Sequence, residues 1–261
     1  MRSALLTLDV NAGVMGGRLR PYAVHAAIAV YFPCLLVADA WPAALWQQYG
    51  LGVVTFTLLL ALLRGSDAAE RRQVWLCVVL ATALEVFASM VWGVYTYRFG
   101  NVPLFVPPGH GLVYLFGLRT RRTPLAVRSG SLVTGAALAA ATLWAAGGVT
   151  VLPAWTGRWD VAGACWWPIL AYCLLRSRNG VVYAAIFAVT AELELIGTGL
   201  GNWTWVGHLP LLLIPVGNPP SAIAGGYCVL DGAATRLARR LAGIRPPVAA
   251  PIEAPALGQP G

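Results

Sequence analysis

The 261-residue chain contains no lysine, and charged residues of all kinds make up only 11% of it. In ordinary soluble domains about a quarter of the residues are charged. Hydrophobic residues make up 58% of the chain, and the mean hydropathy is +0.69. This composition excludes an ordinary soluble domain and indicates a protein embedded in a membrane.

Several motifs that define enzyme classes are also missing. The sequence has no GxxxxGK(S/T) or GxGxxG phosphate-binding loop, no GxSxG or HExxH motif, and no acidic box like that of membrane prenyltransferases. Three histidines cannot build the clusters of a di-iron membrane desaturase. The five cysteines show no CxxC spacing, and we interpret them as small apolar packing residues. We therefore expect no cofactor and no metal centre of a recognised type.

The basic residues, all arginines, alternate with apolar stretches along the chain. Only Arg98 and Arg158 break this alternation. This is the positive-inside pattern of a polytopic membrane protein, in which arginines face anionic lipid headgroups. The net charge of +8 therefore indicates membrane lipids as partners and excludes a nucleic-acid ligand. The arginines assigned to the inner side are Arg2, Arg18, Arg20, Arg64, Arg71, Arg72, Arg119, Arg121, Arg122, Arg128, Arg176, Arg178, Arg236, Arg239, Arg240 and Arg245.

Eight apolar segments are long enough, or nearly long enough, to cross a bilayer as helices. With the arginine-rich connections inside, they predict an all-α polytopic protein of the inner (plasma) membrane with both termini in the cytoplasm. Tryptophans at the predicted outer ends support this orientation, namely Trp41, Trp46, Trp92, Trp155, Trp159, Trp203 and Trp205. The eight segments cover residues 21–40, 49–63, 73–93, 104–118, 130–151, 160–175, 180–200 and 219–235.

A weak internal repeat links the two halves of the chain. EVFASMVWGVYTYRFGNVPLFVPPGHGLVY begins at Glu85, and ELELIGTGLGNWTWVGHLPLLLIPVGNPPSAIAGGY begins at Glu192. We interpret it as a duplication into two parallel four-helix repeats, although proline, glycine and aromatic residues could also gather independently in outer loops. The stretches LFVPPGHG and LIPVGNPPS should be irregular, Pro-broken re-entry segments that line a cavity. The predicted organisation is a cytoplasmic segment 1–20, repeats 21–128 and 129–240, and a disordered Pro/Ala-rich cytoplasmic tail 241–261.

Acidic side chains inside apolar segments indicate a functional site. Glu85, Glu192 and Glu194 lie within such segments, and His110 and His208 lie one in each Pro-rich outer stretch. We predict that they converge as catalytic residues in an outer-half cavity between the repeats. Glu192 and Glu194 point to nearly opposite sides of one helix, and the sequence does not choose between them. The same residues could instead be ordinary buried polar groups or metal ligands.

Aromatic residues flank these acids at matching positions of the repeat, and we predict that they bind substrate: Tyr95, Tyr97, Trp203 and Trp205. Arg98 joins them as a clamp for an anionic headgroup or substrate, with an interfacial anchor as the alternative. Gly197 and Gly201 form a GxxxG pattern, which predicts close packing against another helix.

The segment GVYTYRFGNVPLFVP, with Glu85 upstream, resembles a motif of the membrane carotenoid hydratase family: an acid, then G-x-Y-x-Y, then VPL and a proline. GNWTWVGHLPLLLIP repeats it more faintly. Members of that family are polytopic membrane proteins that add water across a terminal isoprenoid double bond. The resemblance implies an apolar polyene or lipid substrate. The all-arginine, alanine-rich composition is also similar to that of membrane proteins from high-GC actinobacteria.

Three classes of function remain open. The first is an enzyme that performs acid–base chemistry on a polyisoprenoid or lipid, and the second is a proton-coupled carrier of small molecules or lipids. The third is a non-catalytic membrane assembly protein. Aromatic residues beside acids at one depth favour the enzyme. A carrier should continue its polar positions toward the inner face, where Asp231 stands nearly alone. The sequence does not indicate an oligomeric state.

Overall fold

The computed structural model of the chain describes residues 20–41 and 44–241. The predicted segments 1–20 and 241–261 lie, apart from Arg20 and Leu241, outside these residues. The described chain is mostly helical, with one short pair of strands, β1 (Tyr95–Tyr97) and β2 (Trp203–Trp205). The helices are η1 (Arg20–Tyr22), α2 (Ala23–Ala40), α3 (Leu45–Leu63), α4 (Ala68–Val86), η2 (Phe87–Trp92), α5 (Val106–Thr120), α6 (Pro124–Gly148), α7 (Pro153–Thr156), α8 (Val161–Arg176), α9 (Gly180–Leu200) and α10 (Gly225–Leu241).

Each predicted apolar segment overlaps one of the longer helices. In the described part of the chain, five helices are long and apolar enough to cross a membrane, and α8 is a shorter apolar helix. The five are α2, α3, α4 with its π-helical continuation η2, α6 and α9. Their length and composition indicate a multi-pass membrane protein.

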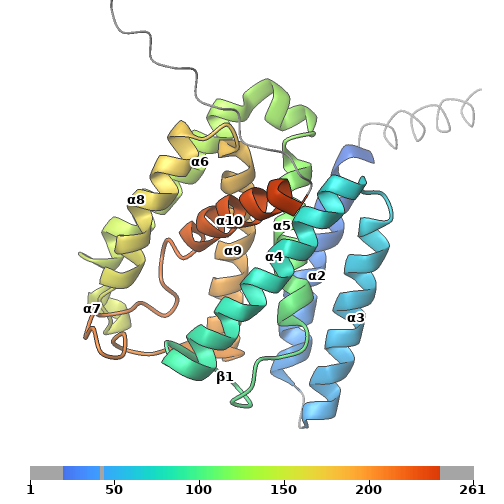
Figure 1. Ribbon diagram of the computed structural model, residues 1–261. Helices are drawn as coiled ribbons and strands as arrows, with labels where there is room; N and C mark the ends of the chain where they lie inside the picture. Colours follow the sequence, from blue (N-terminus) through green and yellow to red (C-terminus); the bar gives the residue numbers. More distant parts are fainter. Residues whose placement is uncertain (1–19, 42–43, 242–261) are drawn as a thin grey trace, which may run out of the picture.

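The connections between helices gather at two opposite ends of the bundle (Figure 1). One end, here called the arginine end, carries the connections 64–67, 121–123 and 177–179. The other, the tryptophan end, carries α7, β1 and β2. Trp41, Trp46, Trp155 and Trp159 are exposed at the tryptophan end, as expected of an interfacial belt. Trp203 and Trp205 are buried instead, so their assignment to that belt was wrong.

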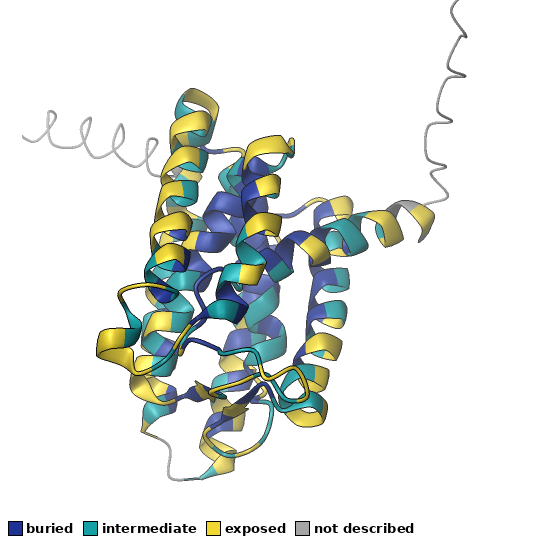
Figure 2. Ribbon diagram, turned by 90° about the vertical axis from the view of Figure 1, so that its left-hand side faces the viewer, coloured by how far each residue is buried: buried dark blue, intermediate teal, exposed yellow. Residues whose placement is uncertain are grey.

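Helix α5 is the centre of the molecule. Leu112, Tyr114 and Leu115 on it are fully buried, and it packs against α2, α3, α4 and α9. Glycines allow this approach: a Cβ on Gly111 would lie 2.8 Å from Leu59, and one on Gly117 would lie 2.6 Å from Ile186. Figure 2 shows the buried faces turned inward and the exposed faces turned outward around the bundle.

The Pro-rich stretches differ from one another. LFVPPGHG was expected to be irregular, but α5 already begins at Val106, with Pro107 and Pro108 in its first turn. Proline is tolerated there because the first backbone N–H groups of a helix have no intrahelical acceptor. LIPVGNPPS does lie outside helices, and α10 begins only at Gly225. The predicted pair of broken segments is therefore correct for the second copy alone.

The strands are a feature that the all-α prediction missed. β1 and β2 pair antiparallel, with Tyr95 opposite Trp205 and Tyr97 opposite Trp203. Residues alternate between the two faces of a strand, so all four rings point to one face while Thr96 and Thr204 point away. This two-stranded ribbon joins segments that are far apart in the sequence and closes the tryptophan end of the bundle interior.

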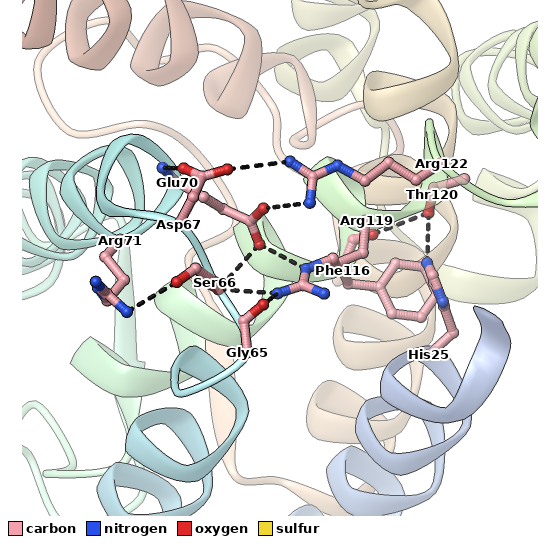
Figure 3. Close-up of polar contacts among 10 residues, drawn as sticks. All are labelled: His25, Gly65, Ser66, Asp67, Glu70, Arg71, Phe116, Arg119, Thr120 and Arg122. Carbon is pink, nitrogen blue, oxygen red and sulfur yellow. Dashed lines mark hydrogen bonds and ion pairs between the residues drawn. The ribbon is translucent and has the colours of Figure 1, made fainter. Parts of the chain in front are cut away.

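An ion-pair cluster around the buried Glu70 fastens the arginine end (Figure 3). Glu70 is 3% exposed, and its carboxylate binds Arg119 at 2.5 Å and Arg122 at 3.0 Å. Ser66 also donates to Glu70. Asp67 caps α4 by accepting from the backbone N–H of Glu70, and this hydrogen bond lowers the pKa of Asp67 below its usual range. The cluster therefore ties the connection between α3 and α4 to the end of α5.

Candidate functional site

A cavity of about 540 Å³ lies on the inner side of the ribbon, among α4, α5, α8, α9 and α10. Apolar side chains form most of its wall, as is usual for sites that take small molecules. The polar and aromatic groups that converge on it are Glu85, Tyr95, Tyr97, His110, Thr190, Glu194, Trp203, Trp205 and Tyr227. Seven of the ten predicted site residues are thus brought together here.

Glu85, near the end of α4, is the most heavily hydrogen-bonded acid in the cavity. Tyr95 and Tyr97 both donate their hydroxyls to its Oε1, at 2.6 Å and 2.5 Å. Burial and the charge of Glu85 raise the pKa of both tyrosines, so their hydroxyls stay protonated and act as donors. His110 Nε2 lies 3.2 Å from Oε2 of Glu85. Both oxygens of the carboxylate are therefore held in place.

His110 links this acid to a residue that the sequence reasoning missed. Its Nδ1 lies 2.7 Å from the hydroxyl of Tyr227 on α10. A neutral His110 with its proton on Nε2 donates to Glu85 and accepts from Tyr227. The sequence does contain a signal for this residue. Tyr227 ends the second segment of the predicted repeat, just as Tyr114 ends the first.

Glu194 is held by indole groups on the other strand of the ribbon. Trp203 and Trp205 donate their Nε1–H groups to the same oxygen, Oε2, at 3.1 Å and 3.0 Å. Gly197 makes this possible, since a Cβ at that position would lie only 2.0 Å from the Trp203 ring. Gly201 adopts φ +75° and ends α9. Gly197 therefore makes room for the Trp203 ring, and Gly201 ends the helix. The predicted helix–helix contact through this GxxxG pair was wrong.

The two acids occupy equivalent places around the ribbon. Each lies on the helix that leads into one strand, and each accepts from both aromatic residues of that strand. The rings pack across the ribbon, with centroids 4.5 Å apart for Tyr95 and Trp205 and 6.0 Å apart for Tyr97 and Trp203. One aromatic platform thus supplies the donors of both acids, tyrosines for Glu85 and tryptophans for Glu194.

Thr190 is the other cavity residue that the sequence did not reveal. It lies on α9 one turn before Glu194, so the two side chains share a face of the helix. Its Oγ1 is buried and has no hydrogen-bond partner. A buried hydroxyl without a partner costs free energy, which fits a group that binds a polar atom of a ligand or water.

Three predicted site residues do not line the cavity. Glu192 is half-buried on another side of α9, so Glu194 is the one of the two neighbouring acids that lines the cavity. His208 is exposed, in a bridge with Pro215 at the tryptophan end. Arg98 donates to the carbonyl of Ala40 at 2.6 Å and lies over the ring of Phe99. These contacts match the anchor alternative for Arg98.

Two further buried acids position the walls of the cavity. Asp39 accepts from Asn202, directly before β2, at 2.8 Å, and so fastens the ribbon to α2. Asp160, the cap of α8, accepts from the backbone N–H groups of Gly217 at 3.0 Å and Ser221 at 2.7 Å. It therefore holds the non-helical 216–221 segment against α8, a role that the sequence reasoning did not assign.

The arrangement offers two carboxyl groups and an imidazole in a predominantly apolar cavity. Among the described residues, no group of three or more histidine, cysteine or acidic side chains is placed to hold a metal ion. The chemistry available from these side chains is proton donation and proton acceptance at an apolar ligand.

Comparisons with protein-family models, with curated proteins and with solved structures find no match for this chain.

Proposed function

We propose that the protein is a membrane enzyme that adds water across a carbon–carbon double bond of a polyisoprenoid or related unsaturated lipid. The observation that carries this proposal is the pair of differently held carboxyl groups, Glu85 and Glu194, facing one apolar cavity. In many enzymes, two carboxyl groups in contrasting environments divide the work, one as proton donor and the other as proton acceptor. The resemblance to carotenoid hydratases points to the same chemistry.

Glu194 is the proposed proton donor. It forms no ion pair with any described residue, and burial in an apolar cavity favours the neutral form of a carboxyl group. Both indoles donate to Oε2, so Oε1 is the oxygen that carries the proton. In the first step the O–H bond of Glu194 breaks and a C–H bond forms at one alkene carbon, leaving a carbocation at the other.

Glu85 and His110 are the proposed base. Three donors, Tyr95, Tyr97 and His110, favour the ionised form of Glu85. Water attacks the carbocation through its oxygen and gives its proton to this pair. The proton then returns to Glu194 before the next turnover, so the net change is the addition of one water molecule.

The aromatic platform supplies electrostatic stabilisation between these two steps. A carbocation near the faces of Tyr95, Tyr97, Trp203 and Trp205 is stabilised by the negative faces of the rings. No arginine among the described residues lines the cavity, so these rings and the carboxylates are the groups that meet positive charge there. We include Thr190 as the group that orients the water.

We further propose that all eight longer helices cross the inner membrane, with the arginine end and both termini in the cytoplasm. The ribbon supports the proposed duplication, because antiparallel strands are related by a local two-fold axis perpendicular to the ribbon. That axis would run along the membrane normal and relate 21–128 to 129–240. A C-terminal reporter that is active only outside the cytoplasm contradicts this topology.

The test is deletion of the gene followed by comparative extraction of lipids and pigments, with rescue by variants at matched membrane abundance. Wild type and Glu192→Gln should restore the profile, because Glu192 lies outside the cavity. Glu85→Gln and Glu194→Gln should accumulate the unhydrated lipid, with at least a roughly 100-fold loss of rate. A profile that is unchanged by the deletion contradicts the proposal.

One observation favours a proton-coupled carrier as the second candidate. Asp231 on α10 accepts from the hydroxyls of Tyr114 and Tyr183 and from Asn179, next to the arginine end. Tyr227 lies one turn before Asp231 on the same helix, so polar groups continue from the cavity toward the inner face. A carrier requires Asp231→Asn to abolish uptake, whereas a hydratase with this variant should retain its lipid product.

A further inference from the structure

Several exposed side chains on α4, η2 and α8 also line the cavity. Its lining includes Leu84 and Phe87, which are 53% and 50% exposed on the α4–η2 side. On the opposite side it includes Cys165 of α8, which is also exposed. Side chains that face both the cavity and the outside on two separate helices define an opening in the side of the bundle.

Other elements frame this opening on its remaining sides. Helix α10 crosses it toward the arginine end and packs against both α4 and α8 (Figure 1). Its first residue, Gly225, approaches α8 so closely that a Cβ there would lie 3.0 Å from the carbonyl oxygen of Trp166. On the tryptophan side, Trp92 of η2 donates to the carbonyl of Pro210 at 3.1 Å. These contacts hold the elements around the opening against one another.

The edge at the tryptophan end is a short hairpin, residues 208–215. The backbone N–H of Leu209 donates to Ile214 at 2.8 Å, and both side chains line the cavity. Its tip is Leu211, Leu212 and Leu213, which are 93%, 56% and 77% exposed. Three exposed leucines beside the tryptophan belt are suited to the acyl chains of a bilayer and not to water.

The ribbon forms the wall of the cavity at the tryptophan end. The ribbon covers the tryptophan end with its buried rings inward and Thr96 and Thr204 outward. Arg158 fixes it further by donating to the carbonyl of Trp205 at 2.7 Å.

We infer that the cavity is loaded from the bilayer through the opening between α4 and α8. The substrate is then a long linear apolar chain whose reacting end lies beside Glu85 and Glu194 while its remainder stays in lipid. This inference rests on the proposed function for the identity of the reacting end, but the route of access is independent of the chemistry. A water-soluble ligand would not use an opening framed by Phe87 and the leucine hairpin.

The experiment uses the full-length protein in phosphatidylcholine vesicles that contain a long hydrocarbon chain with a diazirine at its tip. After illumination, mass spectrometry of the peptides measures labelling at Glu85 and Glu194. We expect both acids to be labelled in wild type. Ala88→Trp places a large ring at the opening, since Ala88 lines the cavity on η2, and should reduce labelling at least roughly ten-fold. Ala140→Trp adds the same bulk to an exposed position of α6 away from the cavity, and should leave labelling unchanged.

A second measurement guards against misfolding of the Ala88 variant. Alkylation of Cys165 by a bulky membrane-permeant pyrenyl maleimide should reduce labelling in wild type but not in Cys165→Ser. Labelling that survives both obstructions, or that never reaches the two acids in wild type, overturns the inference. Labelling measures access alone, so a protein that admits the probe while its deletion leaves the lipid profile unchanged contradicts only the proposed function.

Discussion

Replacing Gly197 by alanine is the sharpest test of the tryptophan-held acid. The new Cβ would lie 2.0 Å from the Trp203 ring, so the rigid indole must move. Moving it breaks the hydrogen bond from Trp203 Nε1 to Glu194, which costs about 1–3 kcal/mol for a buried acceptor. Overfilling the contact costs about 1–3 kcal/mol more. The higher helix propensity of alanine offsets about 1 kcal/mol of this cost, so the net destabilisation of the fold should be about 1–5 kcal/mol.

Gly199→Ala provides the matched control, because no heavy atom lies within 4 Å of a Cβ at that position. It should be neutral or stabilising by up to about 1 kcal/mol. Unfolding of both variants in mild detergent, followed by circular dichroism, measures the difference. Near-ultraviolet dichroism reports whether Trp203 has moved. If Gly197→Ala is as stable as Gly199→Ala and its near-ultraviolet spectrum is unchanged, the assigned contact between Gly197 and Trp203 is wrong.

Further predictions concern the two ends of the bundle. Glu70→Gln should destabilise the protein by about 3 kcal/mol, because it leaves Arg119 without its buried anionic partner; equal unfolding curves for variant and wild type would contradict the ion-pair cluster. Asp67 has a lowered pKa, so its stabilising contribution is present above the unfolded-state pKa of about 3.9 and is lost as the pH falls through the folded-state value. The advantage of wild type over Asp67→Asn in Tm should therefore shrink below about pH 4, and a pH-independent difference would refute this assignment. Leu211 has φ +68°, so Leu211→Gly should stabilise the hairpin by about 1 kcal/mol. Leu212 has no positive φ, so Leu212→Gly should not stabilise it. Equal changes in Tm for the two variants would refute backbone strain at Leu211.

The sequence predicted the helices well because their signal is local and strong. The segment predicted at 180–200 coincides with α9, and the one predicted at 21–40 differs from α2 only at its start. Apolar length and flanking arginines suffice for such assignments. The start of α5 was missed because Pro107 and Pro108 were treated as helix breakers, although the first turn of a helix accepts them.

The ribbon could not be predicted in the same way. Its strands are three residues each, and their pairing partners are far apart in the sequence. The alternation in Tyr-Thr-Tyr and Trp-Thr-Trp was the available signal, since aromatic and β-branched residues favour strands. Without the pairing, Trp203 and Trp205 looked like interfacial residues. The pairing turns them inward and brings them to Glu194.

The two arginines that break the inside pattern are explained by the same part of the fold. Arg98 and Arg158 lie at the tryptophan end, where each donates to a backbone carbonyl, that of Ala40 and that of Trp205 respectively. At the tryptophan end, these two arginines therefore fasten chain segments around the ribbon. These two positions are exceptions to the alternation of arginines, and their backbone contacts explain why they lie at this end.

The buried acids differ in what they bind and in whether they line the cavity. Asp39 and Asp160 bind Asn202 and backbone N–H groups that fasten chain segments, and neither lines the cavity. Glu85 and Glu194 also bind the ribbon, but unlike the other two acids they line the cavity. Buried charged or polar clusters can often be replaced by apolar residues without loss of stability, so stability alone does not account for two carboxyl groups beside an apolar cavity. Their tyrosine and tryptophan donors hold the two carboxyl groups in place beside the cavity, as the proposed proton transfers to and from an apolar ligand require.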